Sequence, residues 1–162
     1  MEHFKNQPIP MLIRQATIHD LPTLLQFEQG VINAERPFDP TLIPGAINYY
    51  DLEMFITSPD VELLVAELDG ELVGSGYARI KPSEKVYFNF DRFAYLGFMF
   101  VSPQHRGKGI NKLIIDELKE WAKAQGLHEL RLQVYADNEG AVRAYEKVGF
   151  CKHMIEMRME VE

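Results

Sequence analysis

The chain has 162 residues, of which 46% are hydrophobic and 25% are charged, a balance typical of one compact globular domain. Its formal net charge of −7 argues against a protein that binds duplex nucleic acid, because such binding requires a large basic surface. Cys151 is the only cysteine, which excludes an intramolecular disulfide and a metal site built from several cysteines. We therefore expect one domain and no metal cofactor.

The first ten residues mix charge, amide and proline, and they contain no apolar stretch of the length that a secretion signal or a membrane span requires. We interpret residues 1–10 as a flexible N-terminal tail and residues 11–162 as a single domain. No membrane association and a cytoplasmic location are the corresponding expectations.

The N-terminal part of the domain predicts a strand followed by two helices. Residues 12–16 are short and mostly apolar, and residues 17–20 offer side-chain oxygens at two N-cap positions for a helix that begins near Leu21. A loop with two prolines follows at residues 35–40, and a helical spacing then resumes over residues 45–56.

The middle of the chain predicts three strands. Residues 61–68 and 71–80 are rich in strand-forming residues and meet at Asp69-Gly70, a pair that suits a two-residue hairpin turn. Residues 86–101 alternate and are heavily aromatic, which predicts a third, long strand that bends near residues 89–92.

The remaining elements predict a helix from Ile110 that Gly126 closes, a strand at residues 130–135, a short helix at 139–147 and a half-exposed strand at 155–161. The fold class is therefore α/β (α+β). We expect a single mixed, mostly antiparallel sheet of about six strands flanked by helices.

A glycine-containing loop, Gln104 to Gly109, joins the strand that ends at Val101 to the helix that begins at Ile110. Free N–H groups and the positive end of the dipole at a helix N-terminus stabilise a phosphate, and glycines let the backbone approach it closely. Basic side chains add positive charge, and neither a Walker A loop nor G-x-G-x-x-G fits the sequence. Taken alone, Gly107-Lys108-Gly109 could also be an ordinary tight turn.

This loop resembles the cofactor loop of the GNAT superfamily of acetyl-CoA-dependent N-acetyltransferases, Q/R-x-x-G-x-G/A, matched by Gln104, Gly107 and Gly109. Residues 138–150 look like a second signature of that family, N-x-x-A-x-x-x-Y-x-K-x-G-F. The two motifs occur in the family's order and span residues 96–150. The resemblance implies the acyl-CoA N-acyltransferase (GNAT) fold.

The implied function is transfer of an acetyl group from acetyl-CoA, the acyl-donor cosubstrate, directly to a primary amine. The acceptor would be a small molecule, an amino acid or a peptide. The alternative is a noncatalytic acyl-CoA-binding module on the same fold.

The resemblance also implies where acetyl-CoA binds. In the family the fourth and fifth strands splay apart, the pantetheine arm pairs with the backbone of the fourth strand, and the pyrophosphate lies on the N–H groups of the loop. Asn111 departs from the family, which usually has a small residue there. The positions implied to bind the cofactor are Met99, Phe100, Val101, Gln104, Arg106, Gly107, Lys108, Gly109, Ile110, Asn111, Asn138 and Tyr145.

Catalysis by direct transfer needs a base for the amine and an acid for the departing thiolate. An amine with a pKa near 10.4 is protonated at neutral pH, and freeing it costs roughly 4 kcal/mol. By resemblance Tyr145 is the catalytic acid, and backbone N–H groups of residues 99–101 polarise the acetyl carbonyl. The base is left open between a water relay and four side chains, Glu28, Glu35, Asp91 and Tyr95.

The acceptor is expected to contact residues 35–39 and the region of residues 87–95, where acidic groups would suit a cationic amine. The exposed edge of the final strand could support a homodimer. Cys151 is interpreted as a thiol packed in that part of the sheet rather than a nucleophile.

Overall fold

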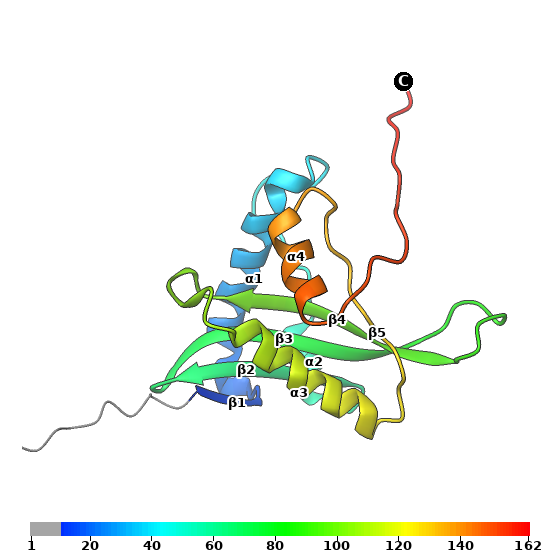
Figure 1. Ribbon diagram of the computed structural model, residues 1–162. Coiled ribbons are helices and arrows are strands. Elements are labelled where there is room, and N and C mark those ends of the chain that lie inside the picture. The colour runs from blue at the N-terminus through cyan, green and yellow to red at the C-terminus, as the bar shows by residue number, and fades with distance from the viewer. Residues whose placement is uncertain (1–10) are drawn as a thin grey trace, which may run out of the picture.

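The computed structural model describes residues 11–162 and contains one mixed sheet of five strands in the order β1-β2-β3-β4-β5 (Figure 1). The first four strands are antiparallel neighbours, and β5 runs parallel to β4. The strands are β1 (Met11–Gln15), β2 (Val61–Leu68), β3 (Glu71–Pro82), β4 (Arg92–Val101) and β5 (Leu130–Arg131). The expected mixed, mostly antiparallel sheet is confirmed, with five strands instead of about six. The expected N-terminal tail, residues 1–10, lies outside the described residues.

Helices cover both faces of the sheet because side chains of a strand alternate between its faces. On β2, Leu63 and Val65 pack with α1 (Leu21–Glu35) and α2 (Leu52–Thr57), whereas Leu64 and Ala66 pack with α3 (Ile110–Ala124). The last helix, α4 (Glu139–Lys147), lies on the α3 side (Figure 1). None of the helices within residues 11–162 is both long and apolar enough to cross a membrane.

The hairpin between β2 and β3 forms as its sequence predicts. Asp69 and Gly70 both have positive φ, 52° and 78°, which is the requirement of a tight two-residue turn. The helices expected at residues 110–124 and 139–147 are confirmed, and Gly126 follows α3 at φ 74°.

The helix expected at residues 45–56 is shorter than predicted, since α2 begins only at Leu52. Glu28 of α1 explains the difference: its Oε2 accepts hydrogen bonds from the backbone N–H groups of Tyr49 (2.9 Å) and Tyr50 (2.8 Å). A carboxylate 21 residues away thus takes the amides that a helix would use, and Asp51 caps the helix that remains.

The long strand expected at residues 86–101 begins only at Arg92. Residues 83–91 instead form the tip of the β3–β4 hairpin, closed by a 2.7 Å hydrogen bond from Ser83 N–H to the Asp91 carbonyl. The rings of Phe88 and Phe90 stack at 5.4 Å with Arg131 over them, so at the tip they pack on one another and on Arg131. The strand expected at 130–135 is likewise reduced to its first two residues.

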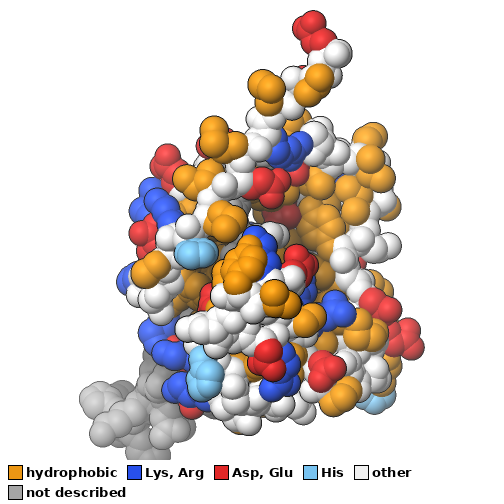
Figure 2. All heavy atoms as spheres, turned by 90° about the vertical axis from the view of Figure 1, so that its right-hand side faces the viewer, with side chains coloured by type: hydrophobic (Ala, Val, Ile, Leu, Met, Phe, Trp, Pro, Cys, Tyr) orange, Lys and Arg blue, Asp and Glu red, His pale blue; other side chains and the backbone are white. Residues whose placement is uncertain are grey.

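The predicted last strand, residues 155–161, does not form among the described residues. The segment after α4 has no regular structure and extends away from the domain (Figure 1), and Figure 2 shows hydrophobic side chains along it. An alternating sequence can form a strand only where a sheet edge pairs with it, and no strand within residues 11–162 does so here. For the same reason Cys151, expected to be packed, is exposed.

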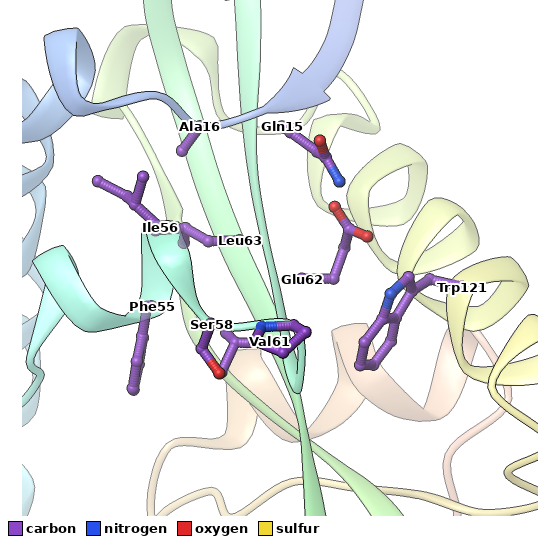
Figure 3. Close-up of a pocket in the computed structure, with 10 residues that line it drawn as sticks. Gln15, Ala16, Phe55, Ile56, Ser58, Val61, Glu62, Leu63 and Trp121 are labelled. Atoms are coloured by element: carbon purple, nitrogen blue, oxygen red, sulfur yellow. The ribbon is translucent and has the colours of Figure 1, made fainter.

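A shallow pocket of about 140 Å³ lies between α2 and α3, at the first residues of β2 (Figure 3). Phe55 and Ile56 of α2 line one side and Trp121 of α3 the other, with Gln15 and Glu62 between them. This pocket includes no residue of the glycine loop or of α4.

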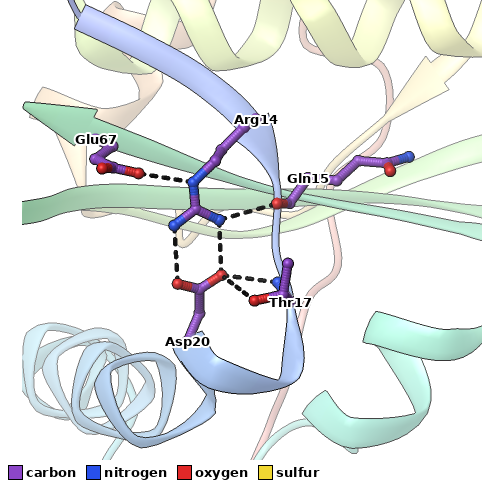
Figure 4. Close-up of polar contacts among 5 residues, drawn as sticks. All are labelled: Arg14, Gln15, Thr17, Asp20 and Glu67. Carbon is purple, nitrogen blue, oxygen red and sulfur yellow. Dashed lines mark hydrogen bonds and ion pairs between the residues drawn. The ribbon is translucent and has the colours of Figure 1, made fainter. Parts of the chain in front are cut away.

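One ion-pair network fastens β1 to the start of α1 and to β2 (Figure 4). The Arg14 guanidinium donates to both carboxylate oxygens of Asp20 (2.8 and 2.9 Å) and to Glu67 (2.7 Å). Asp20 also accepts the Thr17 N–H at 2.7 Å and is only 8% exposed. The hydrogen bonds from Arg14 hold the pKa of Asp20 below its usual value.

Candidate functional site

Strands β4 and β5 diverge soon after they meet. They pair only at Ala94 with Leu130 and at Tyr95 with Arg131, after which β4 continues to Val101 while the chain after β5 leaves the sheet. The backbone of β4 beyond Tyr95 therefore has no neighbouring strand on this side within residues 11–162. Ligands of sheets that contain parallel strands bind beyond the carboxyl ends of those strands, which is where this divergence lies.

A β-bulge marks β4 in the diverging part. Phe98 and Met99 together face the single residue Gly76 of β3, and Phe98 has a φ of 54°, rare for a bulky residue. The buried Ser75 hydroxyl donates a 3.0 Å hydrogen bond to the Phe98 carbonyl and fixes the bulge. A Cβ on Gly76 would lie 2.6 Å from the Met99 sulfur and 2.8 Å from Cγ2 of Ile114, so a larger residue here would force these side chains to move.

Sequence reasoning missed this bulge, although a signal for it exists. Gly74, Gly76 and Gly97 stand inside strands, where glycine often marks a bulge or a close approach of two backbones.

The glycine loop follows β4 directly. A short 3-10 helix, Pro103–His105, leads into Gly107 and Gly109, whose φ values are 77° and 80°, and α3 begins at Ile110. Nothing lies within 4 Å of a Cβ added at either glycine, so the positive φ, not crowding, requires glycine there.

The backbone N–H groups of this loop are available to a ligand. The Arg106 N–H donates a long bond, 3.4 Å, to the Pro103 carbonyl. The next five N–H groups, of residues 107–111, form no hydrogen bond to any other residue of the described chain. Together with the dipole of the 15-residue helix α3, these five donors form a site suited to an anion.

Side chains around the loop differ in what they can contribute. Gln104 and Lys108 are exposed, and Arg106 donates through Nε to the Val101 carbonyl at 3.3 Å. Ile110 is only 2% exposed because it packs in the core, so it can offer a ligand only its backbone N–H. Lys112, in the first turn of α3, pairs with Asp116 at 2.6 Å.

Helix α4 brings Tyr145 toward the diverging strands. Its N-cap is Asn138, whose Oδ1 accepts the Ala141 N–H at 3.3 Å, so we expect any contact of Asn138 with a cofactor to come from its Nδ2 group. The Tyr145 ring packs edge-on against Phe150 with 5.9 Å between centroids. Burial, and secondarily the charge of Glu35, raises the pKa of Tyr145 to about 12, so its phenol stays protonated at neutral pH.

Glu35, the last residue of α1, is partly buried. Burial raises the pKa of its carboxyl above the usual value, against the lowering effect of a hydrogen bond from Tyr49. After burial, the charge of Glu35 is among the causes that raise the pKa of five tyrosines. These five are Tyr49, Tyr50, Tyr95, Tyr135 and Tyr145.

The structure distinguishes the four side chains considered as the base, because their surroundings differ. Glu35 shares its surroundings with Tyr145, whereas Glu28 is fully buried and binds the amides of residues 49–50. Asp91 is exposed at the base of the β3–β4 hairpin loop. The Tyr95 hydroxyl donates to Gln133 at 3.2 Å, across the divergence of β4 and β5.

The connection after α1 meets the chain after β5 at the expected acceptor region. The Tyr135 hydroxyl donates to Asp39 at 3.0 Å, and the Phe38 ring stacks on Tyr135 with 6.3 Å between centroids. Hydrogen bonds from Thr41, and then from Tyr135, hold the pKa of Asp39 at about 2. Of the second expected contact region, Tyr87 is 73% exposed at the hairpin tip and is not brought together with these residues.

A groove of about 490 Å³ lies beside Tyr49 and Tyr50, between the start of α1 and the start of α2. Its floor is the irregular segment 48–51 and its walls are Leu21, Leu25 and the start of α2. No group of three or more acidic, histidine or cysteine side chains within residues 11–162 is arranged to hold a metal ion.

Comparison with known proteins gives both sequence relatives and structural neighbours. Mycothiol acetyltransferase of Paenarthrobacter aurescens (strain TC1) is 32% identical over 94 residues, which are 58% of this chain and 28% of that protein. IAA acetyltransferase of Azospirillum brasilense is 32% identical over 110 residues, 67% of each chain. The chain spans only about a quarter to a third of the length of several curated relatives, 24% to 30%.

Solved structures share the fold at low sequence identity. A tetramutant of the BH1408 protein from Bacillus halodurans matches with a TM-score of 0.83 and 19% identity over 93% of this chain and 99% of that chain. A predicted acetyltransferase from Clostridium acetobutylicum, solved with acetyl-CoA, matches with a TM-score of 0.69 and 19% identity over 93% and 96% of the two chains.

The profile of the Acetyltransferase (GNAT) family matches residues 29–150. That range holds the diverging strands, the glycine loop and α4, which together build the site described above. The chain therefore belongs to the GNAT family of acetyltransferases.

Proposed function

We propose that this protein is an acetyl-CoA-dependent N-acetyltransferase that moves an acetyl group directly to a primary amine of a small molecule, an amino acid or a peptide. The observation that carries the proposal is the row of five free N–H groups, residues 107–111, beside the point where β4 and β5 diverge. Membership of the GNAT family and relatives named as acetyltransferases support it.

Acetyl-CoA, the acyl donor, fits this arrangement along its length. The pyrophosphate would accept hydrogen bonds from residues 107–111, with Arg106 and Lys108 adding positive charge. The pantetheine arm would pair with the free edge of β4 at residues 99–101, and Gln104 and Asn138 would flank it. The bulge at Phe98 would aim backbone N–H groups at the acetyl carbonyl and stabilise the negative charge that develops there.

Tyr145 would supply the proton to the departing thiolate. A pKa of about 12 keeps the phenol protonated at neutral pH, so it can donate a hydrogen bond to the sulfur before it transfers the proton. Its burial against Phe150 restricts the ring to a small range of positions, which favours a defined donor geometry.

Glu35 would receive the proton of the acceptor amine. A carboxylate in a partly buried site is a stronger base than one in water, because burial raises its pKa. The charge of Glu35 is, after burial, a cause of the raised pKa of Tyr145, which supports a role for both residues in one site. The negative charge of Glu35 and Asp39 suits a cationic acceptor.

The rival is a noncatalytic acyl-CoA-binding module on the same fold. The two are separated by recording thiol release when the purified protein is mixed with acetyl-CoA and each member of a panel of amines, including amino acids, polyamines and peptides. Release that depends on both protein and amine supports the enzyme. Binding of acetyl-CoA without release for any amine would instead support the binding module.

A further inference from the structure

The C-terminal segment, residues 151–162, exposes an apolar face that no other part of residues 11–162 covers. Apolar residues alternate with charged ones from residue 155 onward, so an extended strand would carry the apolar side chains on one face. The exposed fractions are 80% for Ile155, 90% for Met157, 86% for Met159 and 83% for Val161.

The domain in turn has an open edge and a helix that is not fully covered. Strand β5 pairs with β4 on one side, and within residues 11–162 no strand pairs with its other side. Helix α4 beside it is amphipathic, yet none of its residues is buried. An added strand could pair with the free edge of β5 and cover the apolar face of α4.

The segment leaves its own domain in a fixed direction. The Phe150 N–H donates to the Tyr145 carbonyl at 3.0 Å, and the Phe150 ring packs on the core, so the chain exits the domain at this point. Farther along, Arg158 contacts Thr41 at 3.1 Å and Asp39 at 3.6 Å. These contacts hold the segment in its extended course (Figures 1 and 2).

We propose that two copies of this chain exchange their C-terminal segments, each segment adding a sixth strand to the β5 edge of the other copy. Exchange is reciprocal, so the pair has two-fold symmetry and the β5 edge of each copy is covered by the segment of the other. Twelve extended residues reach up to about 40 Å, and a domain of this length has a radius of gyration of about 15 Å, so the segment can span a neighbouring sheet.

The exchange also bears on the site. The added strand would lie beside α4, the helix that carries Tyr145, and would add to the packing that Phe150 already gives the Tyr145 ring. This consequence rests on the proposed function, whereas the exchange itself does not.

The test is the mass of the full chain in solution, by size-exclusion chromatography with light scattering, together with hydrogen–deuterium exchange of residues 152–161. We expect twice the 18.7 kDa of one chain and slowed exchange in the segment. A monomer with a protected segment would show that the strand folds back onto its own sheet. A monomer with an unprotected segment, or a dimer with one, would equally overturn the proposal.

Matched variants locate the interface. Ile155→Asp combined with Met157→Asp, on the apolar face, should yield a monomer, and so should a chain that ends at Phe150. Glu156→Gln combined with Glu160→Gln, on the charged face, should stay dimeric. Circular dichroism checks that each variant keeps its helices, and a dimeric apolar-face variant with native helices would contradict the exchange.

Discussion

At the scale of single residues, the proposed reaction depends on Tyr145 acting as the acid and Glu35 as the base. Both have raised pKa values for the same main reason, burial. Tyr145 lies on a helix that the sequence predicted, α4, whereas Glu35, expected in the loop at residues 35–40, is the last residue of α1. Tyr145 could be assigned from its motif. Glu35 could not be separated from Glu28 by sequence, because only the fold shows that the Glu28 carboxylate is bound to backbone amides.

Tyr145→Phe removes one hydroxyl and keeps the ring that packs on Phe150. We expect turnover to fall by about 10²-fold or more, the usual contribution of a positioned proton donor. The affinity for acetyl-CoA should change little, which a binding titration of the variant measures. Turnover equal to that of the unmodified protein would remove Tyr145 as the acid.

Glu35→Gln should lower turnover at neutral pH by about 10²-fold, since a neutral amide cannot take the proton of the amine. In the unmodified protein, activity should rise as the pH increases through the raised pKa of Glu35, because the base acts only when ionised. The variant should lose this part of the pH profile.

Two controls separate this role from a structural one. Glu53→Gln, an exposed carboxylate beside the groove, should leave the profile unchanged. The melting temperature of Glu35→Gln should not fall at neutral pH, because burial makes ionisation of Glu35 unfavourable in the folded state. An unaltered pH profile in this variant would rule out Glu35 as the base.

At the scale of elements, the sequence correctly predicted the turns and helices that depend on interactions between residues close in the chain. The Asp69-Gly70 turn, α3 with its glycines and α4 depend on neighbours a few residues away. The irregular segment 45–51 and the bulge at Phe98 depend on contacts with distant residues, Glu28 and Ser75, so the sequence pattern alone did not specify them. The predicted strand at 155–161 has the right pattern but no pairing strand in the described part of the chain.

The Arg14–Asp20 network makes a prediction about stability. Asp20→Asn should lower the free energy of unfolding at pH 7 by about 2 kcal/mol, the usual contribution of hydrogen bonds to a charged group. The pKa of Asp20 is lowered in the folded state, so this stabilisation is complete above the unfolded value of about 3.9 and is lost as the pH falls below it.

Urea unfolding at pH 7 and at about pH 3 tests both predictions. The difference in free energy of unfolding between Asp20→Asn and the unmodified protein should be smaller at the lower pH. Asp116→Asn, which breaks an ion pair whose side chains are 61% and 50% exposed, is the control and should cost under about 1 kcal/mol. If the two variants lost the same free energy of unfolding, the Arg14–Asp20 network would stabilise the fold no more than an exposed ion pair does.

At the scale of the whole molecule, one sheet brings three sequence-distant parts to one place: the end of α1, the loop before α3, and α4. The motifs predicted the last two because they are contiguous stretches of sequence. The contribution of α1, and the contact between Asp39 and Tyr135, arise only from the order of the strands. The central claim is that the N–H groups of residues 107–111 bind the diphosphate of coenzyme A.

Calorimetric titration of coenzyme A into the unmodified protein, Gly109→Ala and Gly126→Ala tests that claim most directly. Both glycines have positive φ, 80° and 74°, at opposite ends of α3, so each substitution imposes a similar backbone strain of about 1–2 kcal/mol. We expect the unmodified protein and Gly126→Ala to bind alike and Gly109→Ala to bind at least about tenfold more weakly, a difference of 1.4 kcal/mol. Equal affinities in all three proteins, or no binding by the unmodified one, would contradict the account.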